Sequence, residues 1–277
     1  MNEYRYGAPA DEKPLDRLIT DGGYASIFRS IACIGDSLSS GEFETFDQST
    51  GNRGYYDMYD YSWGQFLARM TGARVYNFSR GGMTASEYCE SYAEERGWWD
   101  PSLRSQAYII ALGLNDLINY TQPLGDMSDI NPDDPAQNKK TFTGYYARII
   151  AQYKRIQPDA KFFLVSMPLQ DDYIKNDEER LVAKAHADRL HELAAYFENT
   201  YVIDLYRYAP RRGEDFIKRF CLFGHLNVMG YRLTAEQIGS YIDYIIRHNP
   251  DEFVNVPFIT TEIPFKRYKI RKTRRGA

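Results

Sequence analysis

The chain has 277 residues, of which 43% are hydrophobic and 26% charged, with a formal net charge of −4. This length is sufficient for one large domain with its own core, and the acidic balance argues against a protein that binds nucleic acid. The three cysteines, Cys33, Cys89 and Cys221, are odd in number and form no CxxC pair. We therefore expect neither a disulfide framework nor a structural zinc site.

The sequence shows neither a signal-peptide pattern near its start nor a candidate membrane span. Residues 1–20 contain no apolar segment typical of a signal peptide, and no run of eighteen apolar residues occurs anywhere. These features predict a cytoplasmic protein without a membrane span. The last twelve residues hold seven Lys or Arg and no acid. We expect a solvated basic arm there, with docking to an acidic partner or to the body of the protein as the alternative.

Short apolar runs alternate with helical patterns along the chain. The runs at 31–34, 75–78, 108–112, 162–165 and 201–203 are nearly continuous, which is typical of strands covered on both faces. Helical patterns lie at 62–70, 84–95, 142–156, 177–197 and 234–247. This alternation predicts an α/β fold in three layers, with a five-stranded parallel sheet between two layers of helices.

Two long polar insertions, residues 42–61 and 119–140, interrupt this rhythm. Each follows the carboxyl end of a predicted strand, where open α/β sheets bind their ligands, and we interpret both as lids or mobile loops that select the substrate. The 24 tyrosines fit either a packed core or surfaces that face sugars. We expect one domain over residues 1–277, with a core at about 28–250.

Residues 35–38 (GDSL) follow the first predicted strand directly. A serine at the tip of a strand is exposed, and the next turn can offer its backbone N–H. Alone, this tetrapeptide fits equally well a turn in which Asp36 or Ser37 caps a helix.

Three further segments narrow the interpretation. Residues 77–84 (NFSRGGMT) follow the second strand, residues 113–116 (GLND) follow the third, and residues 224–231 (GHLNVMGY) lie late in the chain. Together with GDSL they resemble the SGNH (GDSL-type) hydrolase family, whose blocks carry Ser, Gly, Asn and His in this order. The resemblance extends from about residue 31 to 233. It implies a flavodoxin-like sheet with strand order 2-1-3-4-5.

The resemblance also implies catalytic roles. Ser37 would attack a carbonyl carbon and His225 would take its proton, while Gly82, Asn115 and the Ser37 backbone N–H would form the oxyanion hole. These residue types suit the chemistry, because a serine hydroxyl needs an adjacent base and imidazole titrates near neutral pH. Taken singly, Gly82 could be a turn glycine and Asn115 a capping residue. Asp36 and Asp116 are interpreted as acceptors that fix loops.

One position departs from the family pattern. An aspartate usually stands three residues before the histidine and orients it, and here that residue is Leu222. A backbone carbonyl that holds His225 is the interpretation we favour. The alternatives are orientation by Glu214, Asp215 or Asp204, or a protein that has lost catalysis.

The sequence thus predicts a serine esterase that hydrolyses acyl or acetyl esters through an acyl-serine, with O-acetylated carbohydrate as a candidate substrate. The alternative is a catalytically silent protein that binds a carbohydrate or ester in the same cleft. His186 and His191 are five residues apart, which does not place two ligands on one helix face, so we expect no metal and no cofactor.

Overall fold

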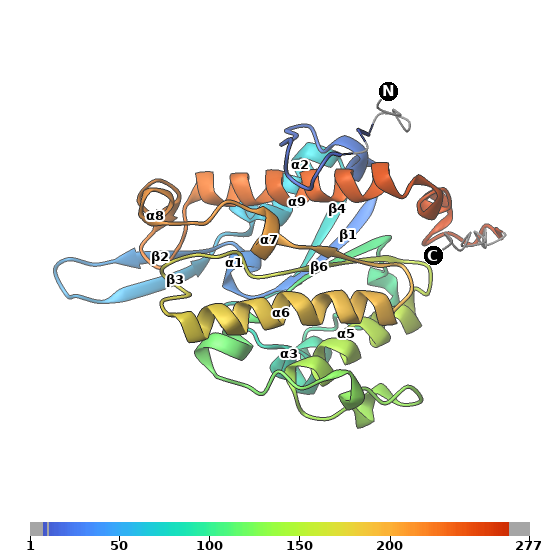
Figure 1. The fold of residues 1–277 in the computed structure, drawn as a ribbon, viewed down its shortest axis with the longest axis horizontal. Helices are drawn as coiled ribbons and strands as arrows, with labels where there is room; N and C mark the ends of the chain where they lie inside the picture. The colour runs from blue at the N-terminus through green and yellow to red at the C-terminus, as the bar shows by residue number, and fades with distance from the viewer. Residues whose placement is uncertain (1–7, 10, 266–277) are drawn as a thin grey trace.

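The computed structural model describes residues 8–9 and 11–265, so the basic arm at 266–277 lies outside the described part. A parallel sheet of five strands, in the order β4-β1-β5-β6-β7, forms its centre (Figure 1). The strands are β1 (Ser30–Gly35), β4 (Arg74–Ser79), β5 (Ala107–Ala111), β6 (Lys161–Val165) and β7 (Thr200–Ile203). Counted along the chain, this is order 2-1-3-4-5, and the predicted three-layer fold is confirmed.

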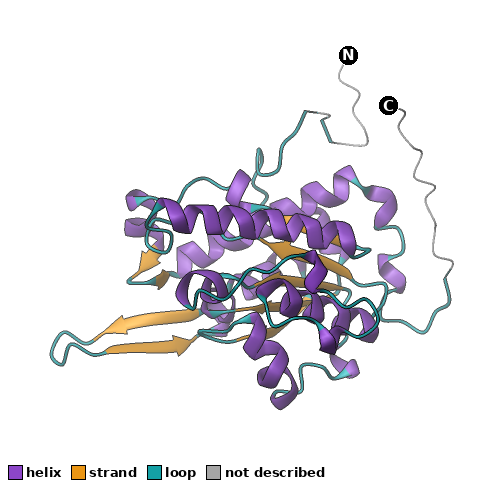
Figure 2. Ribbon diagram, turned by 60° about the horizontal axis from the view of Figure 1, so that its bottom comes forward, coloured by secondary structure: helices purple, strands orange, loops and turns teal. Residues whose placement is uncertain are grey.

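Helices cover both faces of the sheet (Figures 1 and 2). α2 (Trp63–Thr71) and α9 (Val228–His248) pack on one face. α5 (Phe142–Ile156) and α6 (Asp177–Tyr196) pack on the other. β1 contributes alternate side chains to the two cores, which are Ile31 and Cys33 to the first and Ala32 and Ile34 to the second. This two-sided burial explains why the strands are continuous hydrophobic runs.

Polar caps set the starts of these helices. The Ser62 hydroxyl accepts from Gln65 N at 3.2 Å and begins α2, as a helix N-cap does. Thr141 and Asn176 cap α5 and α6 in the same way. α9 begins six residues before the predicted position, because Asn227 caps it by accepting from Gly230 N at 3.0 Å.

Shorter elements complete the fold. The predicted helix at 84–95 is α3 (Ala85–Glu87) and α4 (Ala93–Glu95), joined by a π-helical turn at Tyr88–Tyr92. The elements nearest the site are α1 (Ser37–Ser40), α7 (Leu205–Tyr208), α8 (Glu214–Phe220), β8 (Cys221–Leu222) and β9 (His225–Leu226).

The insertion at 42–61 is a hairpin and not the loop that we predicted. β2 (Glu42–Phe46) pairs with antiparallel β3 (Arg53–Asp57), and the hairpin projects from the body of the molecule (Figures 1 and 2). Its turn is held by the Asp47 carboxylate, which accepts from Ser49 N at 2.8 Å. The second insertion is wound into short 3₁₀ turns around Asp129, which is buried and paired with Lys139.

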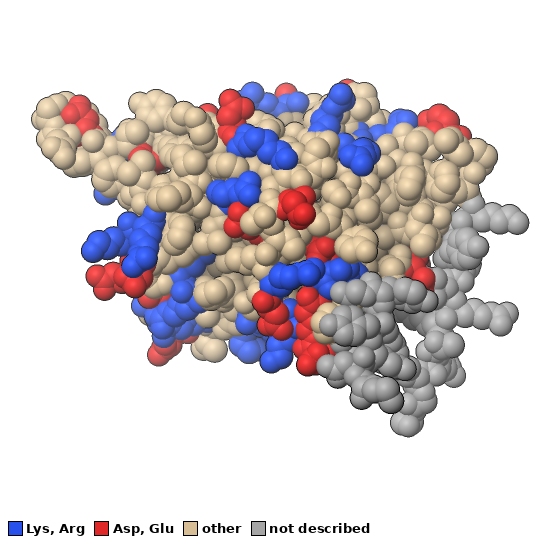
Figure 3. Space-filling model, turned by 90° about the horizontal axis from the view of Figure 1, so that it is seen from above, with Lys and Arg blue, Asp and Glu red and all other residues tan. Residues whose placement is uncertain are grey.

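No helix in the described part of the chain is both long and apolar enough to cross a bilayer. Basic and acidic side chains are interspersed on the face that Figure 3 displays.

Candidate active site

Ser37 is the first residue of α1 and follows β1 after one turn residue. Asp36 caps this short helix, because its Oδ1 accepts from Leu38 N at 3.0 Å. Burial raises the pKa of Asp36 to about 6. The turn is tight, since a Cβ on Gly35 would stand 2.1 Å from the Ser39 hydroxyl. Asp36 therefore fixes the turn that presents Ser37, as the sequence suggested.

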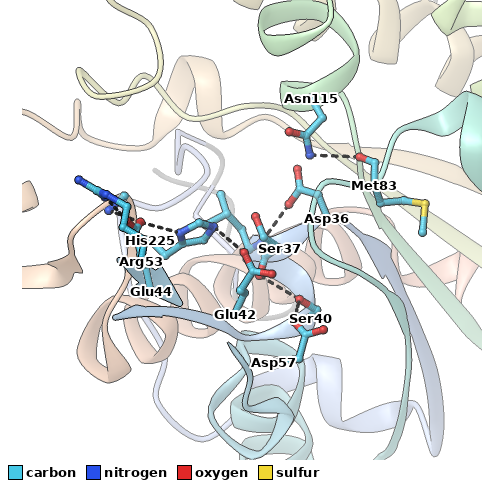
Figure 4. Close-up of polar contacts among 12 residues, drawn as sticks. Asp36, Ser37, Ser40, Glu42, Glu44, Arg53, Asp57, Met83, Asn115 and His225 are labelled. Carbon is cyan, nitrogen blue, oxygen red and sulfur yellow. Dashed lines mark hydrogen bonds and ion pairs between the residues drawn. The ribbon is translucent and has the colours of Figure 1, made fainter. Parts of the chain in front are cut away.

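The sheet brings the other predicted residues to the same edge. β1 pairs with β4 on one side and with β5 on the other, so the segments that follow these three strands are neighbours. Gly82 follows β4 and has φ +72°, a conformation that glycine adopts without strain. Asn115 follows β5 and is buried. Figure 4 shows Asn115, Asp36 and Ser37 around one site.

Hydrogen bonds hold the Asn115 side chain in place. Its Nδ2 donates to Met83 O at 3.2 Å, and its Oδ1 accepts from Asn119 Nδ2 at 2.8 Å. The next residue, Asp116, accepts from Ala85 N at 2.8 Å, and burial raises its pKa to about 7. Asn115 retains one N–H for a ligand, because a primary amide has two donors.

His225 lies in the β8–β9 hairpin, between two carboxylates of β2 (Figure 4). Its Nδ1 is 3.4 Å from Glu44 Oε2, and its Nε2 is 3.1 Å from Glu42 Oε1. The two glutamates are two residues apart on a strand, so both project from the same face. One strand thus supplies a carboxylate to each ring nitrogen.

Glu44 is the more firmly held of the two glutamates. Its side chain is 3% exposed, and its carboxylate is bound by Arg53 and by Gly224 N, the latter at 2.8 Å. Burial alone would raise the pKa of Glu44, but the contacts with Arg53, Gly224 and His225 outweigh it and the pKa falls below its usual value. Glu44 is therefore an anionic acceptor next to Nδ1.

The pKa of His225 lies above its usual value. Burial by itself lowers the pKa, but the hydrogen bonds and charges of Glu42 and Glu44 favour the imidazolium and together outweigh burial. Deprotonated imidazole, the form that can accept a proton from serine, is therefore reached at higher pH than for an isolated histidine.

The three predicted orienting acids lie elsewhere. Asp204 is bound to His191 Nε2 at 2.8 Å and to Arg207. Glu214 and Asp215 are exposed in the first turn of α8. The partner of Nδ1 is a carboxylate and not the backbone carbonyl that we favoured. Leu222 pairs with His225 in the β8–β9 ladder and is exposed.

Sequence reasoning missed Glu44 because it lies 181 residues from His225 in the chain, within a segment interpreted as a loop. The alternation of EFETF was the available signal, since as a strand it places residues 42 and 44 on one face. Tyr231 was also missed. Its buried hydroxyl donates to Glu42 O at 2.6 Å and lies 3.4 Å from Ser37 O, so it ties α9 to both β2 and α1.

In this structure Glu42 holds the nitrogen that Ser37 would need. None of the hydrogen bonds among the described residues joins the Ser37 hydroxyl to His225, although α1 contacts β9. The Glu42 carboxylate also reaches the loop after β4, where a Cβ on Gly81 would stand 2.1 Å from its Oε2. Catalytic hydrogen bonds are often formed only in the substrate complex, so this geometry is compatible with a catalytic pair.

A polar groove continues the site beyond Gly82. Its walls are formed by the segment after β4 and by the segment after Asn119. Two buried polar atoms in its walls, Gln122 Oε1 and Arg80 Nε, have no hydrogen-bond partner among the described residues. The groove next to Gly82 is also lined by the polar residues Thr84, Ser86 and Glu87.

The remaining histidines have other partners. His186 is buried beside Leu112 O, and burial lowers its pKa to about 4. Within the described residues, no group of three or more His, Cys, Asp or Glu side chains is arranged to hold a metal ion.

Several solved structures are similar to this chain. One is a carbohydrate esterase family 2 enzyme plus carbohydrate-binding domain from Corynascus thermopiles (Myceliophthora fergusii), with a TM-score of 0.52 and 15% identity over 79% of this chain and 66% of that one. Another is a family two carbohydrate esterase from Clostridium thermocellum in complex with cellohexaose, with a TM-score of 0.53 and 17% identity over 81% and 65% of the two chains. The chain thus spans about two thirds of the length of these two proteins, and at such identities the likeness shows the fold.

The sequence itself gives the family. A search of curated proteins found no match. The profile of the GDSL-like Lipase/Acylhydrolase family matches residues 33–233, which include Ser37, Gly82, Asn115 and His225. The chain therefore belongs to the GDSL-like lipase and acylhydrolase family.

Proposed function

We propose that this protein is a serine esterase that cleaves short acyl esters of carbohydrates through an acyl-serine intermediate. Family membership supports hydrolysis of an acyl ester. The observation that carries the proposal is the setting of His225, whose Nδ1 faces the buried carboxylate of Glu44 at the edge of the sheet where Ser37 and Asn115 also lie. A histidine held in this way can act as a general base.

In the first step, the Ser37 hydroxyl oxygen bonds to the carbonyl carbon and its proton passes to His225 Nε2. Glu42 must first release this nitrogen. The carbonyl oxygen becomes an oxyanion that accepts from the backbone N–H groups of Ser37 and Gly82 and from Asn115 Nδ2. The bond to the alcohol then breaks, and the proton on Nε2 passes to the leaving oxygen.

In the second step, water gives a proton to Nε2 and attacks the acyl carbon. Collapse of the second tetrahedral species releases the carboxylic acid and returns the proton to Ser37. Glu44 accepts the hydrogen bond from Nδ1 throughout the reaction. This contact stabilises the imidazolium and leaves Nε2 as the nitrogen that accepts the proton from Ser37.

The oxyanion hole leads to a prediction for Asn115. Replacing Asn115 with alanine should reduce kcat by about 10²-fold and change KM little, because the lost donor acts mainly in the transition state. Steady-state kinetics with p-nitrophenyl acetate measures both constants. If kcat stayed the same and only KM rose, Asn115 would instead be a residue that binds the substrate.

Glu42 leads to a prediction about pH. The Glu42→Gln variant removes one of the two carboxylates that raise the pKa of His225, so the acidic limb of the profile of kcat/KM against pH should move to lower pH. Activity requires the deprotonated imidazole, and a lower pKa exposes it at lower pH. An acidic limb that stays in place would show that Glu42 does not contact His225 in solution.

Three observations support a carbohydrate as the alcohol. The groove beside Gly82 is lined by polar side chains, which suit sugar hydroxyls. Near His225, Tyr55 packs edge-on against the imidazole ring, and Phe46 and Phe223 are exposed next to each other. Aromatic faces can cover the apolar face of a sugar ring. The similar structures named above are carbohydrate esterases.

The test combines turnover with covalent labelling. The protein should hydrolyse p-nitrophenyl acetate and acetylated xylose faster than p-nitrophenyl octanoate, and a fluorophosphonate probe should add to one residue, which peptide mass spectrometry should identify as Ser37. Folded protein that neither labels nor turns over any of these esters would instead be a binding protein that uses the same cleft.

A further inference from the structure

Arg212 is a buried cation with neutral partners. It is 2% exposed, in the segment between α7 and α8. Its Nη2 donates to Thr234 Oγ1 and to Gln237 Oε1, each at 3.2 Å, and its Nη1 is 3.4 Å from Gln170 Oε1. Its Nε has no hydrogen-bond partner among the described residues. The guanidinium also lies 4.8 Å from the centre of the Phe216 ring, which covers it.

The ion pairs of the described residues include none that involves Arg212. Its exposed neighbour Arg211 pairs with Asp171 at 2.8 Å. Burial lowers the pKa of Arg212 to about 10, which leaves the side chain charged at neutral pH. A buried charge is costly unless an opposite charge or a full set of hydrogen bonds compensates it, and Arg212 has neither within this part of the chain.

Arg212 lines a cavity of about 70 Å³ beneath α1. Ser39 and Thr234 lie on the same cavity. The Ser39 hydroxyl is buried and has no hydrogen-bond partner among the described residues. Thr234 accepts from Arg212, which leaves its own hydrogen to donate. One water needs only about 10–15 Å³ of such volume, so the cavity has room for a larger group.

Little in the rest of the cavity wall screens the charge of Arg212. Most of the other lining side chains are apolar, so charges interact there with little screening. They include Trp63, Leu112, Leu114, Val165, Met167, Leu205, Leu226 and Ile238. Asp36 is the one acid among the lining residues of the described chain. Its carboxylate caps α1 by accepting from Leu38 N and forms no ion pair with Arg212.

We propose that this cavity binds a small monovalent anion, the size of chloride or acetate, against Arg212. The guanidinium supplies the opposite charge, and the hydroxyls of Ser39 and Thr234 supply neutral donors. The bound anion connects three parts of the chain, which are α1, α9 and the segment between α7 and α8 that carries Arg212. It therefore stabilises the helix that presents Ser37 independently of the ester-cleaving reaction.

Bromide tests the site in the whole protein. Crystals of the full chain soaked in sodium bromide should show an anomalous bromine peak within contact distance of Arg212, and crystals of Arg212→Gln should lack it. A wild-type cavity that contains only water in bromide would overturn the proposal.

Thermal unfolding tests the same site in solution. Replacing sodium gluconate, whose anion is too large for the cavity, with sodium chloride at equal ionic strength should raise the Tm of the wild type by about 3 °C. Arg211→Gln should keep this rise, Arg212→Gln should lose it, and Ser39→Ala should need several-fold more chloride. Sodium acetate in place of chloride tells whether a carboxylate also fits. Equal chloride effects in Arg211→Gln and Arg212→Gln would show that any bromide in the crystal is an adventitious ion only.

Discussion

Replacing Ser37 with alanine is expected to reduce kcat for p-nitrophenyl acetate by roughly 10⁵-fold and to abolish fluorophosphonate labelling. The hydroxyl is the proposed nucleophile, and the rest of the site can only bind the ester and stabilise charge without it. The Ser37 side chain accepts no structural hydrogen bond that the described residues reveal, and α1 is capped by Asp36. We therefore expect the free energy of unfolding to change little.

Ser39 provides a matched control for Ser37. It lies in the same four-residue helix and lines the cavity beneath α1. Ser39→Ala, assayed in saturating chloride, should keep activity within about threefold, because no step of the mechanism uses this hydroxyl. If Ser37→Ala kept labelling and turnover, the nucleophile would be a different residue and the proposed mechanism would fail.

The sheet was predictable from sequence because its strands are buried on both faces. Burial of alternate β1 side chains in two different cores produces an uninterrupted apolar run, which is visible without a structure. The hairpin at 42–57 was not predictable in the same way. Its strands face solvent over much of their length, so polar residues dominate and the segment resembles a loop.

The candidate site also has one part that the sequence predicts and one part that it does not. Ser37, Gly82 and Asn115 follow adjacent parallel strands, and their meeting is a consequence of sheet order that a family pattern carries. The contact between His225 and Glu44 joins two hairpins that lie far apart in the chain. Such a contact depends on how the hairpins pack, and neither periodicity nor a motif encodes it.

The Glu44→Gln variant is expected to lose about 10³-fold in kcat with little change in KM. An amide at this position cannot stabilise the imidazolium, and it can reverse which ring nitrogen carries the proton, which costs about 10⁴ in a Ser-His-Asp protease. We expect a smaller loss here, because the 3.4 Å separation between Glu44 Oε2 and His225 Nδ1 exceeds that of a strong charge-assisted hydrogen bond. Steady-state kinetics across pH measures both constants.

Glu42→Gln is the matched control, because it makes the same change on the same strand at the other ring nitrogen. Both variants should move the acidic limb to lower pH, since each removes a carboxylate that favours the imidazolium. Only Glu44→Gln should lower the plateau that kcat reaches at high pH, where His225 is neutral in the wild type and in both variants. A merely structural role for Glu44 would lower Tm and the amount of active enzyme without moving the limb. Equal plateaus in the two variants would mean that the His225 Nδ1 contact does not orient the base.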